Sequence, residues 1–92
     1  MLSKKIYELR LSFGWTQVQL AQKLGVTKQT VSNWENDNIQ PSIDMLIKLS
    51  KIFGASTDYL LGLTPTNYIN VDGLPISFVS HIVEIINDYK TK

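Results

Sequence analysis

The chain has 92 residues and a formal net charge of +1, which suits one small domain with an appendage rather than several domains. It contains no cysteine, so disulfide bonds and cysteine-based metal sites are excluded. The start of the chain does not read as a signal peptide, and no apolar stretch approaches the roughly 20 residues that span a bilayer. We therefore expect a cytoplasmic protein with no membrane partner.

Residues 2–13 are predicted to form the first helix, because apolar side chains recur there at spacings of three and four residues. Gly14 follows directly, and a glycine just after the last apolar residue is a common helix end. The apolar side chains are Leu2, Ile6, Leu9 and Phe13. They predict an amphipathic helix with one side in a core.

Two further helices are predicted on either side of Gly25, over residues 17–24 and 28–37. Thr16 and Thr27 stand at the expected N-caps, where a threonine hydroxyl can accept a backbone N–H. Glycine takes the left-handed backbone conformation at low cost, so Gly25 suits the turn. The residues predicted to face inward are Leu20, Ala21, Leu24, Val26, Val31, Trp34 and Glu35. This pattern is typical of a helix-turn-helix, whose second helix lies in the DNA major groove.

A fourth helix is predicted over residues 43–53 and a short fifth helix over 58–61. Ser42 is the expected cap of the fourth helix, and either Ser56 or Thr57 caps the fifth. The apolar residues of the fourth helix are Ile43, Leu46, Ile47, Leu49, Ile52 and Phe53. A core of about five short helices is feasible at this chain length without disulfides or metals.

The predicted division of the chain is a domain over residues 1–63, a linker over 64–74 and a C-terminal segment over 75–92. Within the linker, residues 68–71 alternate between apolar and polar, which suggests one short strand or extended segment. Lysine and arginine outnumber aspartate and glutamate by seven to five in the first domain, but not in the remainder. This modest positive charge predicts weak DNA binding by a single copy and a dependence on dimerisation.

A final helix is predicted over about 76–89, and apolar residues cover most of its circumference, more than a surface helix normally shows. The predicted dimer-interface residues are Ile76, Phe78, Val79, Ile82, Val83, Ile85, Ile86 and Tyr89. Because the first five helices close their own core, we expect this helix to pack on a second copy of itself as well as on its own domain.

The stretch from Gln17 to Asn36 resembles the Cro/cI-type helix-turn-helix family of phage-repressor-like proteins. It reads Gln17-x-x-Leu20-Ala21-x-x-Leu24-Gly25-Val26-x-x-x-x-Val31-x-x-Trp34-Glu35-Asn36. The resemblance extends over roughly residues 2–63 and does not cover the rest. It implies an all-α, five-helix lambda-repressor-like DNA-binding domain, followed here by a C-terminal dimerisation helix. Double-stranded DNA is the partner that it implies.

The outward side of the third helix carries polar residues suited to base recognition, and in the family its N-terminal end enters the groove. At about 100° per residue, three of these residues lie opposite the apolar side and two flank them. Amide side chains can pair with adenine, lysine with guanine, and a threonine methyl can touch the thymine methyl. The candidate base-contacting residues are Lys28, Gln29, Thr30, Ser32 and Asn33. The alternative is that they are ordinary solvated side chains.

The resemblance also implies phosphate contacts near the ends of the second and third helices, where backbone N–H groups favour anions. The candidate phosphate-contacting residues are Thr16, Gln17, Thr27, Asn36, Asn38 and Arg10. Thr16 could serve as a cap alone, and Asn36 could serve only to end the third helix. Many relatives carry a basic residue near position 38, whereas Asn38 is neutral.

Arg10 and Glu35 resemble a pair that links the first helix to the third in several relatives. Arg10 would then hold the recognition helix and also reach a phosphate. The alternative is an exposed Arg10 whose ion pair contributes little to stability.

Catalytic and metal-binding patterns are missing from the sequence. His81 is the single histidine, and no aspartate, glutamate or cysteine cluster accompanies it at ligand spacing. We therefore expect no metal and no cofactor, while a pH-sensitive dimer contact at His81 stays open. No acid–base pair, nucleophile constellation or phosphate-cradling glycine loop is found, so an enzyme is not expected.

These observations predict a sequence-specific DNA-binding transcriptional regulator, a repressor that binds a pseudo-palindromic operator as a homodimer. The alternative is the antitoxin of a toxin–antitoxin pair, whose C-terminal helix binds a partner protein. An antagonist protein could use the same helix. The family resemblance implies control of a phage or mobile element.

Overall fold

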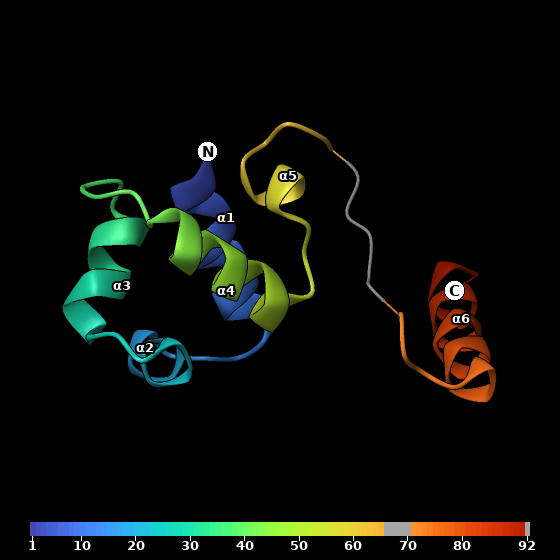
Figure 1. Cartoon of the computed structure of the whole chain (residues 1–92). Coiled ribbons are helices and arrows are strands. Elements are labelled where there is room, and N and C mark those ends of the chain that lie inside the picture. The colour runs from blue at the N-terminus through green and yellow to red at the C-terminus, as the bar shows by residue number, and fades with distance from the viewer. Residues whose placement is uncertain (66–70, 92) are drawn as a thin grey trace.

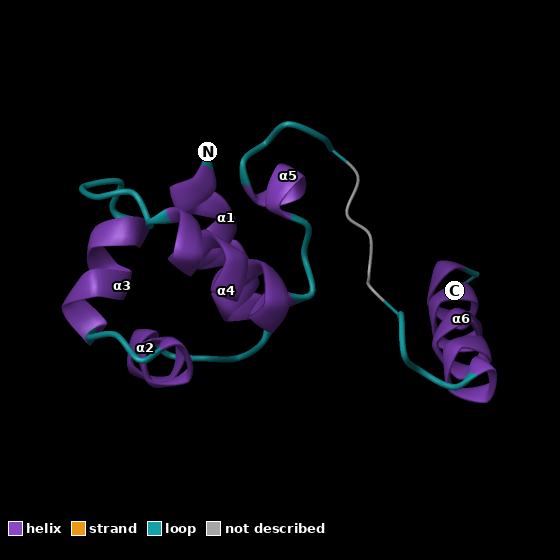
Figure 2. Ribbon diagram, in the orientation of Figure 1, coloured by secondary structure: helices purple, strands orange, loops and turns teal. Residues whose placement is uncertain are grey.

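The computed structural model describes residues 1–65 and 71–91, and this part of the chain consists of helices and loops without a strand (Figure 2). The helices are α1 (Leu2–Ser12), α2 (Gln17–Leu24), α3 (Lys28–Glu35), α4 (Ile43–Phe53), α5 (Thr57–Leu60) and α6 (Ile76–Lys90). The predicted all-α fold, with five helices and a C-terminal helix, is confirmed. The short strand predicted over residues 68–71 falls mostly outside the described residues, and Val71 lies in no strand.

Threonine or serine hydroxyls cap the N-terminal ends of four of the six described helices, as the sequence predicts. Thr16 caps α2 in a capping box with Gln19, and Thr27 caps α3 by accepting a backbone N–H. Ser42 caps α4 in the same way, and of the two candidates for α5 the cap is Ser56. Each such cap typically contributes about 1 kcal/mol to helix stability.

The helix ends differ from the predicted ones by one or two residues. α1 ends one residue early, because Phe13 is already its C-cap. α3 ends at Glu35 rather than at 37, because Asn36 is the C-cap and Asp37 turns to a positive φ of 59°. α5 begins and ends one residue earlier than predicted, and α6 continues one residue further, to Lys90.

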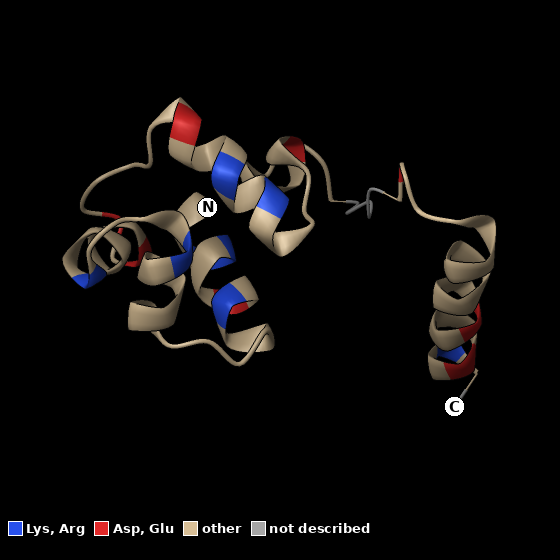
Figure 3. Ribbon diagram, turned by 60° about the horizontal axis from the view of Figure 1, so that its bottom comes forward, with Lys and Arg blue, Asp and Glu red and all other residues tan. Residues whose placement is uncertain are grey.

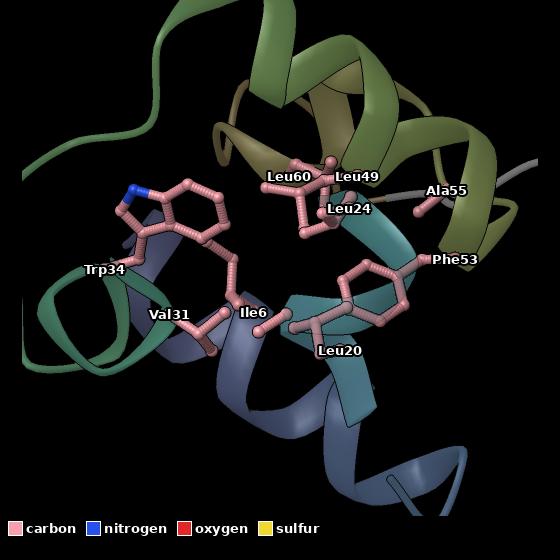
Figure 4. Close-up of a cluster of buried hydrophobic side chains, with 10 residues drawn as sticks. Ile6, Leu20, Leu24, Val31, Trp34, Leu49, Phe53, Ala55 and Leu60 are labelled. Atoms are coloured by element: carbon pink, nitrogen blue, oxygen red, sulfur yellow. The ribbon is translucent and has the colours of Figure 1, made fainter. Parts of the chain in front are cut away.

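One hydrophobic core joins α1 to α5, with apolar side chains from all five helices pointing toward one another (Figure 4). The buried side chains are Ile6, Leu20, Ala21, Leu24, Val31, Trp34, Leu49, Phe53, Ala55 and Leu60. Burying a large apolar side chain contributes about 1.5–3 kcal/mol, so this cluster is the main source of stability. Val31 and Trp34 bring α3 into the core and thereby turn its polar side outward.

The buried face of α4 is narrower than its run of apolar residues suggests. Leu49 and Phe53 reach the core, whereas Ile43 is 77% exposed and Ile47 is 43% exposed. α4 is therefore anchored mainly through Leu49 and Phe53, while Met45 and Leu46 pack against the edge of the core and Ile43 and Ile47 lie at the surface.

α6 stands apart from the five-helix group in Figure 1. None of its residues is buried, and all but Val79 and Ile82 are exposed. The expectation that α6 also packs on its own domain is therefore wrong. The physical reason is that α1 to α5 close a core of their own, to which α6 contributes no residue.

Candidate nucleic-acid interface

The turn between α2 and α3 sets the position of the candidate recognition helix. Gly25 ends α2 with φ 73° and ψ 31°, in the left-handed region that glycine adopts without strain. The N–H of Val26 then donates to the carbonyl of Ala21 at 3.0 Å, so the chain folds back against α2. Ala21 is 3% exposed, and its small side chain lets α2 and α3 pack closely.

Glu35 at the end of α3 accepts hydrogen bonds from two other helices. Arg10 of α1 donates from Nε to Oε2 at 2.6 Å and from Nη2 to Oε1 at 3.0 Å. Gln17 of α2 donates from Nε2 to Oε1 at 3.1 Å. Arg10 also donates from Nη1 to the carbonyl of Trp15 at 2.8 Å. These bonds fix the orientation of α3 relative to α1 and α2.

The pair of Arg10 and Glu35 is almost fully enclosed, with side chains that are 9% and 4% exposed. The hydrogen bond to Glu35 raises the pKa of Arg10, although burial acts in the opposite direction. The predicted link between the first and third helices is therefore confirmed, and the alternative of an exposed Arg10 is wrong. Leaving either charge without its partner would be costly in this enclosed site.

The phosphate contact predicted for Arg10 stays a prediction. Three of the five N–H groups of its guanidinium already donate to Glu35 and to the carbonyl of Trp15. A phosphate contact would have to use the two remaining N–H groups of a residue that is 7% exposed. The contacts in the structure make Arg10 a residue that positions α3.

At about 100° per residue, Gln29, Ser32 and Asn33 lie on the side of α3 away from its buried residues, and Lys28 and Thr30 flank them. Lys28 and Gln29 are exposed, whereas Thr30, Ser32 and Asn33 are half-buried. α3 thus presents a polar surface that begins at its N-terminal end, the end that commonly contacts base edges in a helix-turn-helix.

Side-chain hydrogen bonds along α3 hold several of these residues in place. Gln29 donates from Nε2 to Oδ1 of Asn33 at 3.0 Å. The hydroxyls of Thr27 and Thr30 lie 2.9 Å apart and share a hydrogen bond. Because each of these bonds joins residues three or four positions apart, they lie along one helix and order its polar surface.

The residues predicted to contact phosphate, other than Arg10, lie at the ends of α2 and α3. The Thr16 and Thr27 hydroxyls each accept a backbone N–H at 3.1 Å. Asn36 is the C-cap of α3, which confirms its helix-terminating role, and it also donates to the Ser32 hydroxyl at 3.2 Å. Asn38 is exposed, with its backbone N–H bonded to the carbonyl of Asn33 at 2.9 Å. The phosphate contacts themselves stay predictions.

The hydrogen bond between Gln17 and Glu35 was not predicted from the sequence, nor was the bond between Arg10 and the Trp15 carbonyl. Gln17 and Glu35 are 18 positions apart, and no periodicity in the sequence connects them. A signal was nevertheless present, because a carboxylate predicted to face inward needs donors from neighbouring helices.

Basic residues do not form one dense stripe (Figure 3). They are distributed over α1, α2, α3, α4 and α6. Over residues 1–65 and 71–91, no group of three or more histidine, cysteine, aspartate or glutamate side chains could hold a metal ion. Among the helices of these residues, none is both long enough and apolar enough to cross a membrane.

A helix pair joined by a tight turn, with the polar side of the second helix open to solvent, defines the helix-turn-helix class of DNA-binding proteins. The model of the helix-turn-helix family matches residues 6–60, more than half of the chain. The chain belongs to this family. The resemblance to the Cro/cI-type proteins is thereby confirmed.

Relatives and solved structures agree with this assignment. The HTH-type transcriptional regulator ImmR of Bacillus subtilis (strain 168) is 34% identical over 90 residues, which cover 98% of this chain and 71% of ImmR. The SPbeta prophage-derived regulator YonR of the same strain is 32% identical over 91 residues, covering 99% and 73%. The P22 c2 repressor bound to a synthetic operator has a TM-score of 0.63 at 30% identity, covering 65% and 91%. SinR in complex with DNA has a TM-score of 0.61 at 34% identity, covering 66% and 98%.

The protein is thus a transcriptional regulator with the helix-turn-helix fold, close in structure to a phage repressor and to SinR. Its family and relatives are regulators rather than enzymes. The five-helix domain has the lambda-repressor-like arrangement that the resemblance implies.

Proposed function

We propose that the protein is a repressor that binds a pseudo-palindromic operator in double-stranded DNA as a homodimer. The observation that carries the proposal is the polar side of α3, turned outward by buried Val31 and Trp34 and held by the bonds of Arg10 to Glu35. The P22 c2 repressor and SinR, which share this fold at 30% and 34% identity, were solved with DNA, and this supports the proposal.

Gln29 is the strongest candidate for a base-specific contact. It is exposed, and its bond to Asn33 uses one N–H of its amide. Its carbonyl oxygen and second N–H are left to accept from N6 and donate to N7 of one adenine. Lys28 at the start of α3 suits a guanine, and Thr30, Ser32 and Asn33 suit neighbouring bases. The proposal therefore includes adenine as the base opposite Gln29.

Phosphate contacts would position the domain on the duplex without reading its sequence. The N-terminal end of α2 offers Thr16 and Gln17, and its backbone N–H groups favour an anion. Thr27 would act at the start of α3, and Asn36 and Asn38 after its end. The modest charge of the domain fits binding that needs two copies on one operator.

The proposed dimer uses α6, which has eight apolar residues, none of them buried in the single chain. In this proposal residues 1–63 bind DNA, 64–74 link, and 75–92 dimerise. Two recognition helices would then lie about 34 Å apart, one helical turn of DNA, and read the two halves of the operator. We place the protein in the cytoplasm, where such an operator would be.

The experiment is a selection from random duplexes with the full chain, followed by affinity measurements on the enriched sequence. The proposal predicts enrichment of two inverted half-sites whose centres are about 10 base pairs apart. The same selection is repeated with the Gln29→Ala variant, which leaves the core residues Val31 and Trp34 unchanged. For this variant the enriched base should change at one position in each half-site. Recovery of no common sequence at low salt would refute the proposal.

A second candidate function is capture of the regulator by an antagonist protein, which the open apolar surface of α6 favours. A SinR protein/SinI protein complex matches the whole chain with a TM-score of 0.61, but at 22% identity this likeness concerns the fold alone. A chain that stays monomeric at micromolar concentration would favour this candidate over homodimerisation. The antitoxin alternative is not adopted, because the relatives named above are described as transcriptional regulators.

A further inference from the structure

The apolar residues of α6 fall into two separate rows, each with the spacing of a coiled-coil seam. In both rows the steps alternate between three and four residues, which is the spacing of the a and d positions of a heptad. Row A consists of Ile76, Val79, Val83 and Ile86. Row B consists of Phe78, Ile82, Ile85 and Tyr89. A helix that pairs with one partner needs only one such row.

The two rows face different directions. At about 100° per residue, the centres of row A and row B are roughly 110° apart around the helix. A helix in a four-helix bundle contacts two neighbours at roughly a right angle, so two rows at this separation match two neighbouring helices. Six polar residues fill the opposite side of α6: Ser77, Ser80, His81, Glu84, Asn87 and Asp88. Lys90, the last residue of the helix, follows Ile86 by four positions and so ends row A with a charge.

Both rows are open in the single chain. In row A, Ile76 is 84% exposed and Val83 is 48% exposed. In row B, Ile85 is 62% exposed and Tyr89 is 79% exposed. No residue of α6 is buried, so the five-helix domain does not cover either row. The charged residues of α6 lie in its second half, away from Ile76 (Figure 3).

The chemistry of row A favours further copies of this chain as the occupants. Its four side chains are all isoleucine or valine, and β-branched residues at both a and d positions favour more than two strands. With 15 residues, α6 is about 22 Å long, so a single row offers two heptads of contact. Two heptads bury a small area compared with the roughly 800 Å² per partner of a stable interface. Contacts through the second row would increase the buried area.

We propose that α6 assembles four copies of the chain into a four-helix bundle, in which row A pairs with row A of one copy and row B with row B of another. Such isologous pairs generate a tetramer with two-fold axes, the commonest symmetric assembly after the dimer. The inference rests on the proposed function, in which α6 is the element that joins the copies. The tetramer carries two pairs of DNA-binding domains, enough for two operators.

Sedimentation equilibrium of the full chain and of three variants tests this assembly. The row A variant is Val83→Asn with Ile86→Asn, the row B variant is Ile82→Asn with Ile85→Asn, and the combined variant has all four changes. We expect a tetramer for the wild type, a dimer for each single-row variant and a monomer for the combined variant. Glu84→Gln, on the polar side, is the matched control and should remain a tetramer.

A wild-type dimer or trimer would overturn the tetramer, as would a single-row variant that remains a tetramer or becomes a monomer. Thermal melting of each variant checks that the five-helix domain is folded, because its core contains no residue of α6. Binding to the selected operator distinguishes failure of the tetramer proposal from failure of the proposed function. A wild-type dimer that binds it overturns only this inference, whereas a tetramer that binds no duplex overturns only the proposed function.

Discussion

Arg10 and Glu35, 25 positions apart, form a two-pronged ion pair in which the guanidinium of α1 holds the carboxylate at the end of α3. Gln17 of α2 donates to the same carboxylate. The pair is enclosed between helices, so both side chains are held in one position by the surrounding residues. It connects the packing of the domain to the surface that the domain offers to DNA, because α3 carries both Glu35 and the predicted base-contacting residues.

Replacing Arg10 by methionine should destabilise the domain by about 3–5 kcal/mol, because Glu35 would be left buried without its cation. The measurement is the free energy of unfolding from denaturant titration. The control is the double variant Arg10→Met with Glu35→Leu, which removes both charges and should recover much of the loss. Equal losses in the single and double variants would contradict the account.

The stabilisation from this pair should persist at alkaline pH. The pKa of Arg10 is raised in the folded state, mainly by its hydrogen bond to Glu35. A raised pKa contributes stability that is complete below the unfolded pKa of arginine and is lost only as pH rises through the higher folded value. The stability difference between wild type and Arg10→Met should therefore be constant from pH 7 to about pH 10. A difference that vanishes over this range would show that the ion pair is not its source.

Gly25→Ala should destabilise the protein by about 1–2 kcal/mol, because alanine is strained in the left-handed conformation. A Cβ at this position would meet no atom within 4 Å, so the strain lies in the backbone alone. Asparagine tolerates this conformation better, and Gly25→Asn should cost less than Gly25→Ala. A shift in the thermal midpoint reports the order of the three proteins, and an unchanged midpoint in Gly25→Ala would contradict the role given to the turn.

Gln29→Ala and Gln17→Ala should affect DNA binding in different ways. Loss of Gln29 should relax the preference for one base by about 1–3 kcal/mol of discrimination, because its contact is to a base edge. Loss of Gln17 should weaken binding evenly across sequences, because its predicted contact is to a phosphate. Affinities for the selected operator and for single-base variants of it measure both effects. The same pattern of losses for the two variants would contradict the assigned roles.

Removal of residues 75–92 should abolish self-association and weaken operator binding strongly, since one half-site would then be bound at a time. Sedimentation gives the oligomeric state, and polarisation of a labelled operator gives the affinity. The five-helix domain should still fold, since residues of α1 to α5 make up its core. An unchanged oligomeric state after the deletion would contradict the role of α6.

Local features of the fold could be predicted from the sequence, whereas features that depend on tertiary contacts could only partly be. Thr16, Thr27 and Ser42 cap their helices as predicted, because a cap depends on residues within one turn. The packing of α6 on its own domain was predicted wrongly, because its periodicity shows that apolar rows exist but not what covers them. The exposure of Ile43 on α4 was not predicted for the same reason: the apolar pattern does not show which residues are covered.

In the candidate site, too, features set by spacing within one helix could be predicted, whereas those set by contacts between helices could not be predicted in this way. The outward side of α3 followed from helical spacing, since Val31 and Trp34 determine which side is buried. The contribution of Gln17 to the Glu35 network depends on how α2 and α3 cross, which spacing within one helix does not encode. The contact between Arg10 and Glu35 was predicted through family resemblance rather than through periodicity.

The most direct test of the account is a crystal structure of the full chain bound to the duplex recovered by selection. The account predicts that α3 lies in the major groove, with Lys28, Gln29 and Asn33 within hydrogen-bond distance of base edges and the Arg10–Glu35 pair intact. A complex in which this side of α3 faces away from the bases would contradict it.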